Sequence, residues 1–197
     1  MYNRSWLSIC IAAILTVSAF AIDLPNPDKT PGDALTKVPD ERAADCISSK
    51  TGRSVDAGDT ITLQMVCVGG YTQCVRKVSP ETKKRVYMNY GLTGNHTGFC
   101  NSDQGCEVDH LISLELGGSN DIKNLWPEPY ENERFNAHVK DQLENFLHTE
   151  VCAGRISLKQ AQKEISENWK ESFTRRLGSP DIASRPEPRG YAAVSPD

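Results

Sequence analysis

An aspartate and a histidine stand next to each other at Asp109 and His110, at the end of a short run with apolar flanks. A carboxylate binds a hard divalent cation through oxygen, and a neutral imidazole takes a proton from water near pH 7. A cation on one side of a phosphodiester and a His-activated water on the other make an in-line hydrolysis site. Successive strand residues face opposite sides, so both groups can reach one reacting centre only where the strand ends or bends.

The residues around this pair predict a strand, a loop, a second strand and a helix. A Gly-Gly turn follows at residues 117–118, and Asn124 opens a second short apolar run. Pro-Glu-Pro at residues 127–129 is expected to be a rigid turn, in which Glu128 serves as a turn residue rather than as a metal ligand. The unit would bring an imidazole, a carboxylate and an amide close together.

A long amphipathic helix is predicted over roughly residues 131–149, because apolar side chains recur there at helical spacing. Lys140 and Glu144 lie four residues apart on it, and a surface ion pair is the expected role for them. His148 lies too far along this helix to be expected as a ligand.

The pattern D-H-L-I-x-L-x-x-G-G-x-N-x-x-x-N-L, which begins at Asp109, resembles the HNH endonuclease motif, also known as the ββα-metal nuclease finger. The wider stretch, from about residue 70 to residue 169, resembles a group of small secreted HNH proteins. The resemblance implies that His110 is the general base and that Asp109 is a metal ligand. It also implies that Asn124 braces the loop and orients the histidine.

The second metal ligand that the resemblance implies is a His or Asn on the helix. Asn132, Asn136 and His138 all lie near the corresponding place, and spacing from Asp109 favours Asn132, followed by His138. An oxygen-rich ligand set indicates a single divalent cation, Mg²⁺. If His138 is the ligand, Mn²⁺, Ni²⁺ or Zn²⁺ are alternatives.

The fold that the resemblance implies is α+β: a ββα-metal (HNH) finger with additional strands and helices in a disulfide-stapled single domain. The implied function is a metal-dependent endonuclease that hydrolyses phosphodiester bonds in DNA, with RNA as a further candidate substrate. The expected partner is therefore nucleic acid, and the chain is expected to be a monomer. A catalytically inactive secreted binding protein on the same fold is the alternative, and a divalent-dependent plasmid assay would distinguish the two. A toxin would also be an active nuclease, but would need an inhibitor protein or a delivery domain.

The two ends of the chain differ in composition from its middle. Arg4, an apolar run and a small-x-small site predict a signal peptide over residues 1–21, which would export the chain to the periplasm or the medium and leave no membrane contact after cleavage. Residues 22–59 are rich in Pro, Asp, Gly and Ser and are expected to be an extended lead-in. The HNH nuclease domain would then span residues 60–178, followed by a disordered tail over residues 179–197.

Six cysteines remain once Cys10 leaves with the signal peptide, and an even number in an exported chain predicts disulfides. A zinc knuckle is the competing interpretation, but no C-x-x-C occurs. Six cysteines allow fifteen pairings, and the residues alone do not choose among them. The related HNH proteins imply Cys67–Cys152; Cys100–Cys106 would close a small loop before Asp109, and Cys46–Cys74 is the pair that remains.

Other elements can be predicted from local patterns. Alternating apolar residues predict a strand over residues 60–68, and residues 71–78 are expected to be extended. Ser79 and Pro80 begin a predicted helix that ends before Gly91. Ser157 and Gln160 form a capping box for a helix that ends near residues 177–178.

The charge of the chain is slightly acidic, with a net −4 from 22 basic and 26 acidic residues, which argues mildly against a protein that coats nucleic acid. Residues 76–85 form a local exception, because they contain a basic cluster: Arg76, Lys77, Lys83, Lys84 and Arg85. The cluster is either a solvated helix face or a substrate contact. Arg76 is the predicted substrate-binding residue, because it is expected on the extended segment rather than on the exposed helix.

Overall fold

The computed structural model describes residues 25–92, 105–130 and 134–180. It is a mixed structure of helices around one small antiparallel sheet, as an α+β fold requires. The elements in order are α1 (Glu41–Thr51), α2 (Leu63–Val66), α3 (Tyr71–Val75), α4 (Pro80–Asn89), β1 (Cys106–His110), the 3-10 turns η2 (Leu114–Leu116) and η3 (Ile122–Asn124), β2 (Leu125–Pro129), α5 (Ala137–Cys152) and α6 (Leu158–Leu177).

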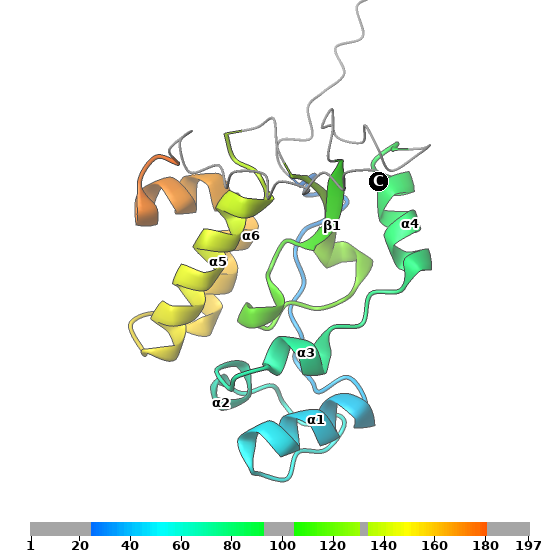
Figure 1. Ribbon diagram of the computed structural model, residues 1–197, viewed down its shortest axis with the longest axis vertical. Coiled ribbons are helices and arrows are strands. Elements are labelled where there is room, and N and C mark those ends of the chain that lie inside the picture. Colours follow the sequence, from blue (N-terminus) through cyan, green and yellow to red (C-terminus); the bar gives the residue numbers. More distant parts are fainter. Residues whose placement is uncertain (1–24, 93–104, 131–133, 181–197) are drawn as a thin grey trace, which may run out of the picture.

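The sheet lies between two helical layers. In Figure 1, β1 has the paired helices α5 and α6 on one side and α4 on the other, while α1, α2 and α3 gather at one end of the molecule. The order strand, loop, strand, helix that was expected for this region is present. Its helix begins at Ala137 rather than near residue 131, because the side chain of Asn136 caps it by accepting from the backbone N–H of Val139 at 3.2 Å.

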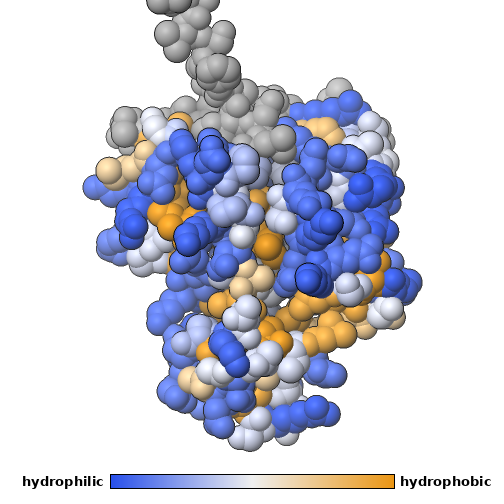
Figure 2. Space-filling model, turned by 180° about the vertical axis from the view of Figure 1, so that it is seen from behind, coloured by the Kyte–Doolittle hydropathy of each residue, from blue (hydrophilic) through white to orange (hydrophobic). Residues whose placement is uncertain are grey.

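Two hydrophobic clusters form the interior. The larger one joins α5 and α6 to the loop after β1, and its centre includes Trp126, Leu143 and Trp169. The smaller one holds α1, α2 and α3 together around Ile47 and Tyr71. Figure 2 shows a mostly hydrophilic surface, with apolar side chains visible where this smaller lobe meets the rest of the molecule.

The prediction of an extended lead-in over residues 22–59 is wrong, because α1 lies within it. Asp40 caps this helix by accepting from the backbone N–H of Ala43 at 2.9 Å, and Gly52 ends it with a left-handed φ of 68°. Ile47 is fully buried on its inner face. The prolines and glycines that suggested a linker flank a short amphipathic helix with proper caps, and two of the serines, Ser48 and Ser49, lie within it.

The predicted strand over residues 60–68 is also wrong. Thr60 makes a single bridge with Lys37, and the chain then turns into α2, where Thr62 accepts from the backbone N–H of Met65 at 3.4 Å. Residues 71–78 are likewise not wholly extended, since α3 occupies the first five of them. A strand needs a partner along its length, whereas a short helix satisfies its backbone locally.

The two helices predicted from caps are present. Ser79 caps α4 by accepting from the backbone N–H of Thr82 at 3.1 Å. Ser157 caps α6 in the same way through Gln160 at 3.1 Å, but the side chain of Gln160 bonds Glu164 instead of closing a capping box.

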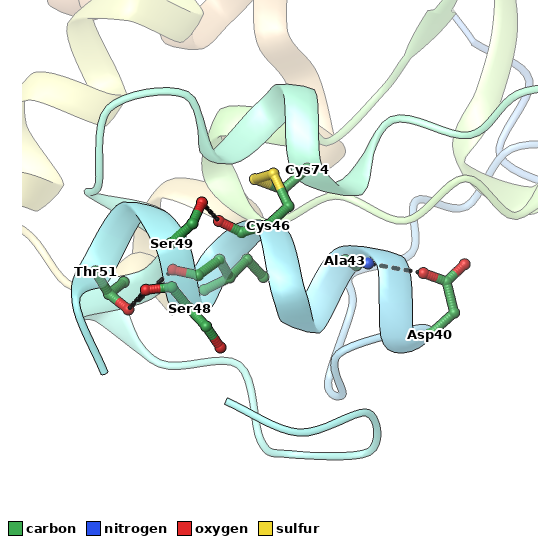
Figure 3. The surroundings of a disulfide bond; sticks show 8 residues. Asp40, Ala43, Cys46, Ser48, Ser49, Thr51 and Cys74 are labelled. Atoms are coloured by element: carbon green, nitrogen blue, oxygen red, sulfur yellow. Dashed lines mark hydrogen bonds between the residues drawn. A yellow bond between two sulfur atoms is a disulfide. The ribbon is translucent and has the colours of Figure 1, made fainter. Parts of the chain in front are cut away.

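Two of the three predicted disulfides are confirmed. Cys46–Cys74 joins α1 to α3 with a Cα–Cα distance of 5.4 Å (Figure 3), and Cys67–Cys152 joins the end of α2 to the end of α5 at 5.6 Å. Cys100 lies outside the described residues, so the pairing Cys100–Cys106 stays a prediction. The predicted signal peptide and residues 181–197 of the tail lie outside them as well. No helix in the described ranges is both long enough and apolar enough to span a membrane.

Residues 127–129 are not the rigid turn that was predicted; they continue β2. Pro127 pairs with Val108 and Pro129 with Cys106 in the antiparallel register. Leu111 N–H donates to the carbonyl of Asn124 on one flank of the hairpin. Because hydrogen-bonded and non-bonded pairs alternate, both prolines fall at positions whose backbone nitrogen faces away from β1.

Candidate active site

Asn124 organises the loop that follows the Asp-His pair. It is fully buried, and its amide donates to the carbonyls of Ile112 and Ser119, each at 2.9 Å. Its Oδ1 accepts from the backbone N–H of Ile112 at 2.9 Å and of Asp33 at 3.2 Å. The side chain therefore holds the residues just after His110 against the residues just before β2.

Gly118 lets the loop close around this asparagine. A Cβ at residue 118 would lie 1.7 Å from the carbonyl oxygen of Ile112 and 2.9 Å from Nδ2 of Asn124. No side chain fits there. The Gly-Gly turn is needed for this close approach of two backbone segments.

Asp109 and His110 point to opposite sides of β1. Asp109 faces α5, where Nζ of Lys140 lies 2.6 Å from its Oδ2. His110 faces the loop, where its Nε2 lies 3.2 Å from Oδ1 of Asn120. His110 is the last residue of β1, so the strand does end at the pair, but the two side chains do not converge on one face.

Three carboxylates gather on the Asp109 side of the hairpin. Glu107 lies two residues before Asp109 on β1, and Glu128 pairs with Glu107 across the sheet. One oxygen from each of Glu107, Asp109 and Glu128 lies within 4.8 Å of the others. Glu128 is 1% exposed, and its Oε1 has no hydrogen-bond partner in the structure as described. Glu128 is thus a buried group of this cluster and not a turn residue.

Lys140 enters the same cluster from α5. Its side chain is 1% exposed; its ammonium donates to Asp109, to the backbone carbonyl of His110 at 2.9 Å, and to Glu144. The expected surface pair of Lys140 with Glu144 is therefore wrong, because both side chains are turned into the protein. We call Glu107, Asp109, Glu128, Lys140 and Glu144 the acidic cage.

The acidic cage holds more acids than one ammonium can neutralise. Burial raises the pKa of Glu128 well above its ordinary value, and burial raises that of Glu144 to about 8. Burial also acts on Asp109, but the charge and the hydrogen bond of Lys140 outweigh it and lower the pKa of this carboxyl. The same acids raise the pKa of Lys140 against its burial. Asp109 and Lys140 thus form the ionised pair, surrounded by acids that resist ionisation.

His110 is buried with a different set of neighbours. Burial lowers its pKa below the usual value; Asp109 acts in the opposite direction, and the charges of Arg76 and Lys140 act in the same direction as burial. The ring is therefore neutral at pH 7, as a general base must be.

Arg76 is the predicted substrate residue, and its charge contributes to lowering the pKa of His110. It follows α3 directly, in extended conformation, and its side chain is exposed. Lys77 is paired with Asp40 at 2.9 Å. The remaining members of the basic cluster, Lys83, Lys84 and Arg85, are exposed on α4, which packs against both strands.

In the described part of the chain, none of the helix residues that the resemblance implied as metal ligands lies beside Asp109. Asn132 lies outside them, and the side chain of Asn136 caps α5. His138 is exposed, with its ring centroid 6.4 Å from that of Tyr130. His148 lies next to Cys67 and Cys152, but those two sulfurs are joined in a disulfide.

A pocket in the described part of the chain has Asn120 in its lining. Three aspartates and one lysine are among its lining residues, so its charge does not suit a phosphate: Asp33, Leu35, Pro39, Asp40, Val75, Lys77, Ser119, Asn120 and Asp121. This pocket is therefore not a candidate phosphate site.

Reasoning from the sequence missed four members of the acidic cage: Glu107, Glu128, Lys140 and Glu144. Two of them could have been detected from the sequence. Glu107 and Asp109 alternate on one strand, so both carboxylates had to share a face. Glu128 would have joined them if residues 127–129 had been recognised as a strand. The burial of Lys140 follows only from the docking of α5 against the hairpin, which no local pattern reveals.

Searches of family models, of curated proteins and of solved structures found no match to this chain. The resemblance to HNH endonucleases therefore stays a prediction. The site has to be judged by its own geometry.

Proposed function

We propose that this chain is an exported, metal-dependent endonuclease with an HNH-type ββα finger, which hydrolyses phosphodiester bonds in DNA, with RNA as a further candidate. The observation that carries the proposal is the pairing of two groups on adjacent residues. The acidic cage lies around Asp109 and the neutral imidazole of His110 lies on the opposite face of β1, so both groups would act on one phosphate only beyond the end of the strand, where His110 is the last residue.

The acidic cage fits a hard divalent cation. Glu107, Asp109 and Glu128 offer oxygen ligands within 4.8 Å of one another, and the buried Oε1 of Glu128 lacks a hydrogen-bond partner among the described residues. Oxygen ligands suit Mg²⁺. When bound there, the cation would offset negative charge on the phosphate and on the leaving oxygen. Asn132 stays a candidate ligand, and Mn²⁺, Ni²⁺ or Zn²⁺ stay tied to the proposal that His138 is one.

The chain's own residues supply the other parts of the reaction. His110 would take a proton from the attacking water, since its lowered pKa keeps the ring neutral at pH 7. Arg76 is exposed, and its charge would hold a phosphate of the substrate. Asn124 would keep His110 in place by fixing the loop behind it.

Two further features of the proposal concern where the protein acts. The disulfides Cys46–Cys74 and Cys67–Cys152 support an oxidising compartment, which agrees with the signal peptide expected over residues 1–21. We propose secretion or a periplasmic location, and a monomer as the active form.

The decisive experiment is plasmid relaxation with Mg²⁺ and with EDTA, comparing the parent with His110→Ala. General-base catalysis is worth about 10²- to 10⁴-fold, so the variant should lose at least that much while keeping its circular dichroism spectrum. His148→Gln is the matched control, because it removes an imidazole on α5 that lies beside Val66 and Cys152. Full cleavage by His110→Ala would refute the assignment.

A catalytically inactive binding protein is the second candidate, and two observations favour it. Lys140 already neutralises Asp109, and His110 is only 3% exposed. On this alternative the acidic cage is an internal ion-pair network. The parent would then bind oligonucleotides without cleaving them in Mg²⁺, Mn²⁺, Ni²⁺ or Zn²⁺.

A further inference from the structure

Asn120 connects the ring of His110 to the backbone at the end of α3 and just after it. Its Oδ1 lies 3.1 Å from the backbone N of Lys77, and its Nδ2 lies 2.8 Å from the backbone O of Val75. The same Oδ1 lies 3.2 Å from Nε2 of His110. Asn120 is part of the G-G-x-N pattern, but the resemblance assigned it no role.

The two backbone contacts fix which end of the amide is which. A backbone N–H can only donate and a backbone carbonyl can only accept, so Nδ2 must face Val75 and Oδ1 must face Lys77. An amide oxygen has two lone pairs and no proton. The contact with His110 can therefore be a hydrogen bond only if Nε2 carries the hydrogen.

We propose that Asn120 is a positioning residue that holds neutral His110 as its Nε2–H tautomer, which leaves Nδ1 as the atom that accepts the proton from water. The catalytic role of the Nδ1 lone pair rests on the proposed function. The tautomer assignment does not depend on it. In the described part of the chain, no group hydrogen-bonds Nδ1. Nδ1 is bonded directly to Cγ, so the basic atom lies on the strand side of the ring, while the far side is anchored.

Two contacts tie this anchor to α1, one a disulfide and the other an exposed ion pair. Val75 follows Cys74, which is joined to Cys46 of α1. Lys77 pairs through Nζ with Oδ2 of Asp40 at 2.9 Å, while Oδ1 of Asp40 caps α1 (Figure 3). The acceptor for His110 is therefore fixed by covalent and polar contacts that do not involve the acidic cage.

The tautomer can be read directly from the nitrogen-15 spectrum of His110 at a pH where the ring is neutral. In the parent, Nε2 should give a pyrrole-type signal and Nδ1 a pyridine-type signal, from a single species. In Asn120→Ala the two signals should move toward each other as tautomers mix, and kcat for plasmid cleavage should fall about 10- to 100-fold with KM unchanged. Asn145→Ala, which removes an exposed amide on α5, is the matched control and should change neither.

A second variant separates positioning from folding. Asn120→Asp keeps an acceptor for Nε2 and for the Lys77 N–H, so it should retain the Nε2–H species even if stability falls. A parent spectrum with the proton on Nδ1 would overturn the inference, and so would an Asn120→Ala variant with unchanged spectrum and kcat. If the parent shows the expected tautomer but His110→Ala still cleaves, the proposed function fails while the tautomer assignment stands.

Discussion

The ammonium of Lys140 lies 2.6 Å from Oδ2 of Asp109, in a part of the protein where the lysine side chain is 1% exposed. The contact joins the middle of α5 to β1. It also decides the electrostatics of the acidic cage, because Lys140 is its one cation among the described residues. A buried ion pair is weak support for net stability, but breaking one from one side is costly.

Lys140→Met should therefore lower the free energy of unfolding by about 3–5 kcal/mol, because it leaves the carboxylate of Asp109 buried without its partner. Urea denaturation at pH 7 measures this. If the acidic cage binds a divalent cation, added Mg²⁺ should restore part of the loss, since a ligand that binds only the folded state stabilises it. Lys163→Met, at a lysine side chain that is 70% exposed, is the control and should stay within about 0.5 kcal/mol. Equal stability of the two variants would contradict the buried pair.

The stability of the protein should fall as pH rises from about 5 to about 8. Burial raises the pKa of Glu144 from 4.5 to about 8, against the effect of Lys140. Between these values the folded chain holds a proton that the unfolded chain releases, so unfolding becomes easier with rising pH, by up to about 1.4 kcal/mol per unit. Glu144→Gln should flatten the dependence of Tm on pH, whereas Glu167→Gln, at a side chain that is 67% exposed, should not. A Tm of the parent protein that rises with pH over this range would contradict the prediction.

Gly118→Ala should cost more than about 4 kcal/mol of unfolding free energy, because the added Cβ would lie 1.7 Å from the carbonyl oxygen of Ile112. The loop would have to open, which removes the hydrogen bonds of Asn124. Gly69→Ala is the matched control: its Cβ meets no atom within 4 Å. Thermal unfolding compares the two, and a soluble Gly118→Ala protein with an unchanged Tm would show that the loop is not closed as described.

The two disulfides should differ in how much they contribute to the free energy of unfolding. Cys67–Cys152 spans a sequence separation of 85 and Cys46–Cys74 one of 28. On the chain-entropy model, loss of the first costs about 4–5 kcal/mol and loss of the second about 3–4 kcal/mol. Urea denaturation of the two double Cys→Ser variants measures the order. At temperatures where the Cys67–Cys152 variant stays folded, plasmid cleavage should match the parent, because neither sulfur lies in the acidic cage.

Local signals in the sequence were sufficient to predict the elements whose ends are set by residues of the same segment, such as capping residues. Ser79 and Ser157 start helices by capping them, and Gly91 has the left-handed φ of 73° that follows the end of α4. The hairpin and its loop were predictable for the same reason, since Gly118 and Asn124 act within a few residues of each other.

Contacts between distant segments were not predictable in this way. The alternating residues before Cys67 had the pattern of a strand but no strand to pair with, so α2 formed instead. Lys140 had the spacing of a surface pair, and only the docking of α5 on the hairpin buries it. The structure of the site departs from the sequence prediction at residues such as Lys140, whose partners lie on a different secondary-structure element.

The prolines of β2 have a consequence for how copies of this protein meet. The unpaired edge of a β-strand presents free amide hydrogens and carbonyls to other molecules, and aggregation can begin there. Residues 127 and 129 turn their nitrogens outward along that edge, and a proline nitrogen has no hydrogen to give. All five residues of β2 are also buried, and the carbonyl of Leu125 already accepts from Thr30, so this margin of the sheet offers a second molecule neither amide hydrogens at residues 127 and 129 nor open access.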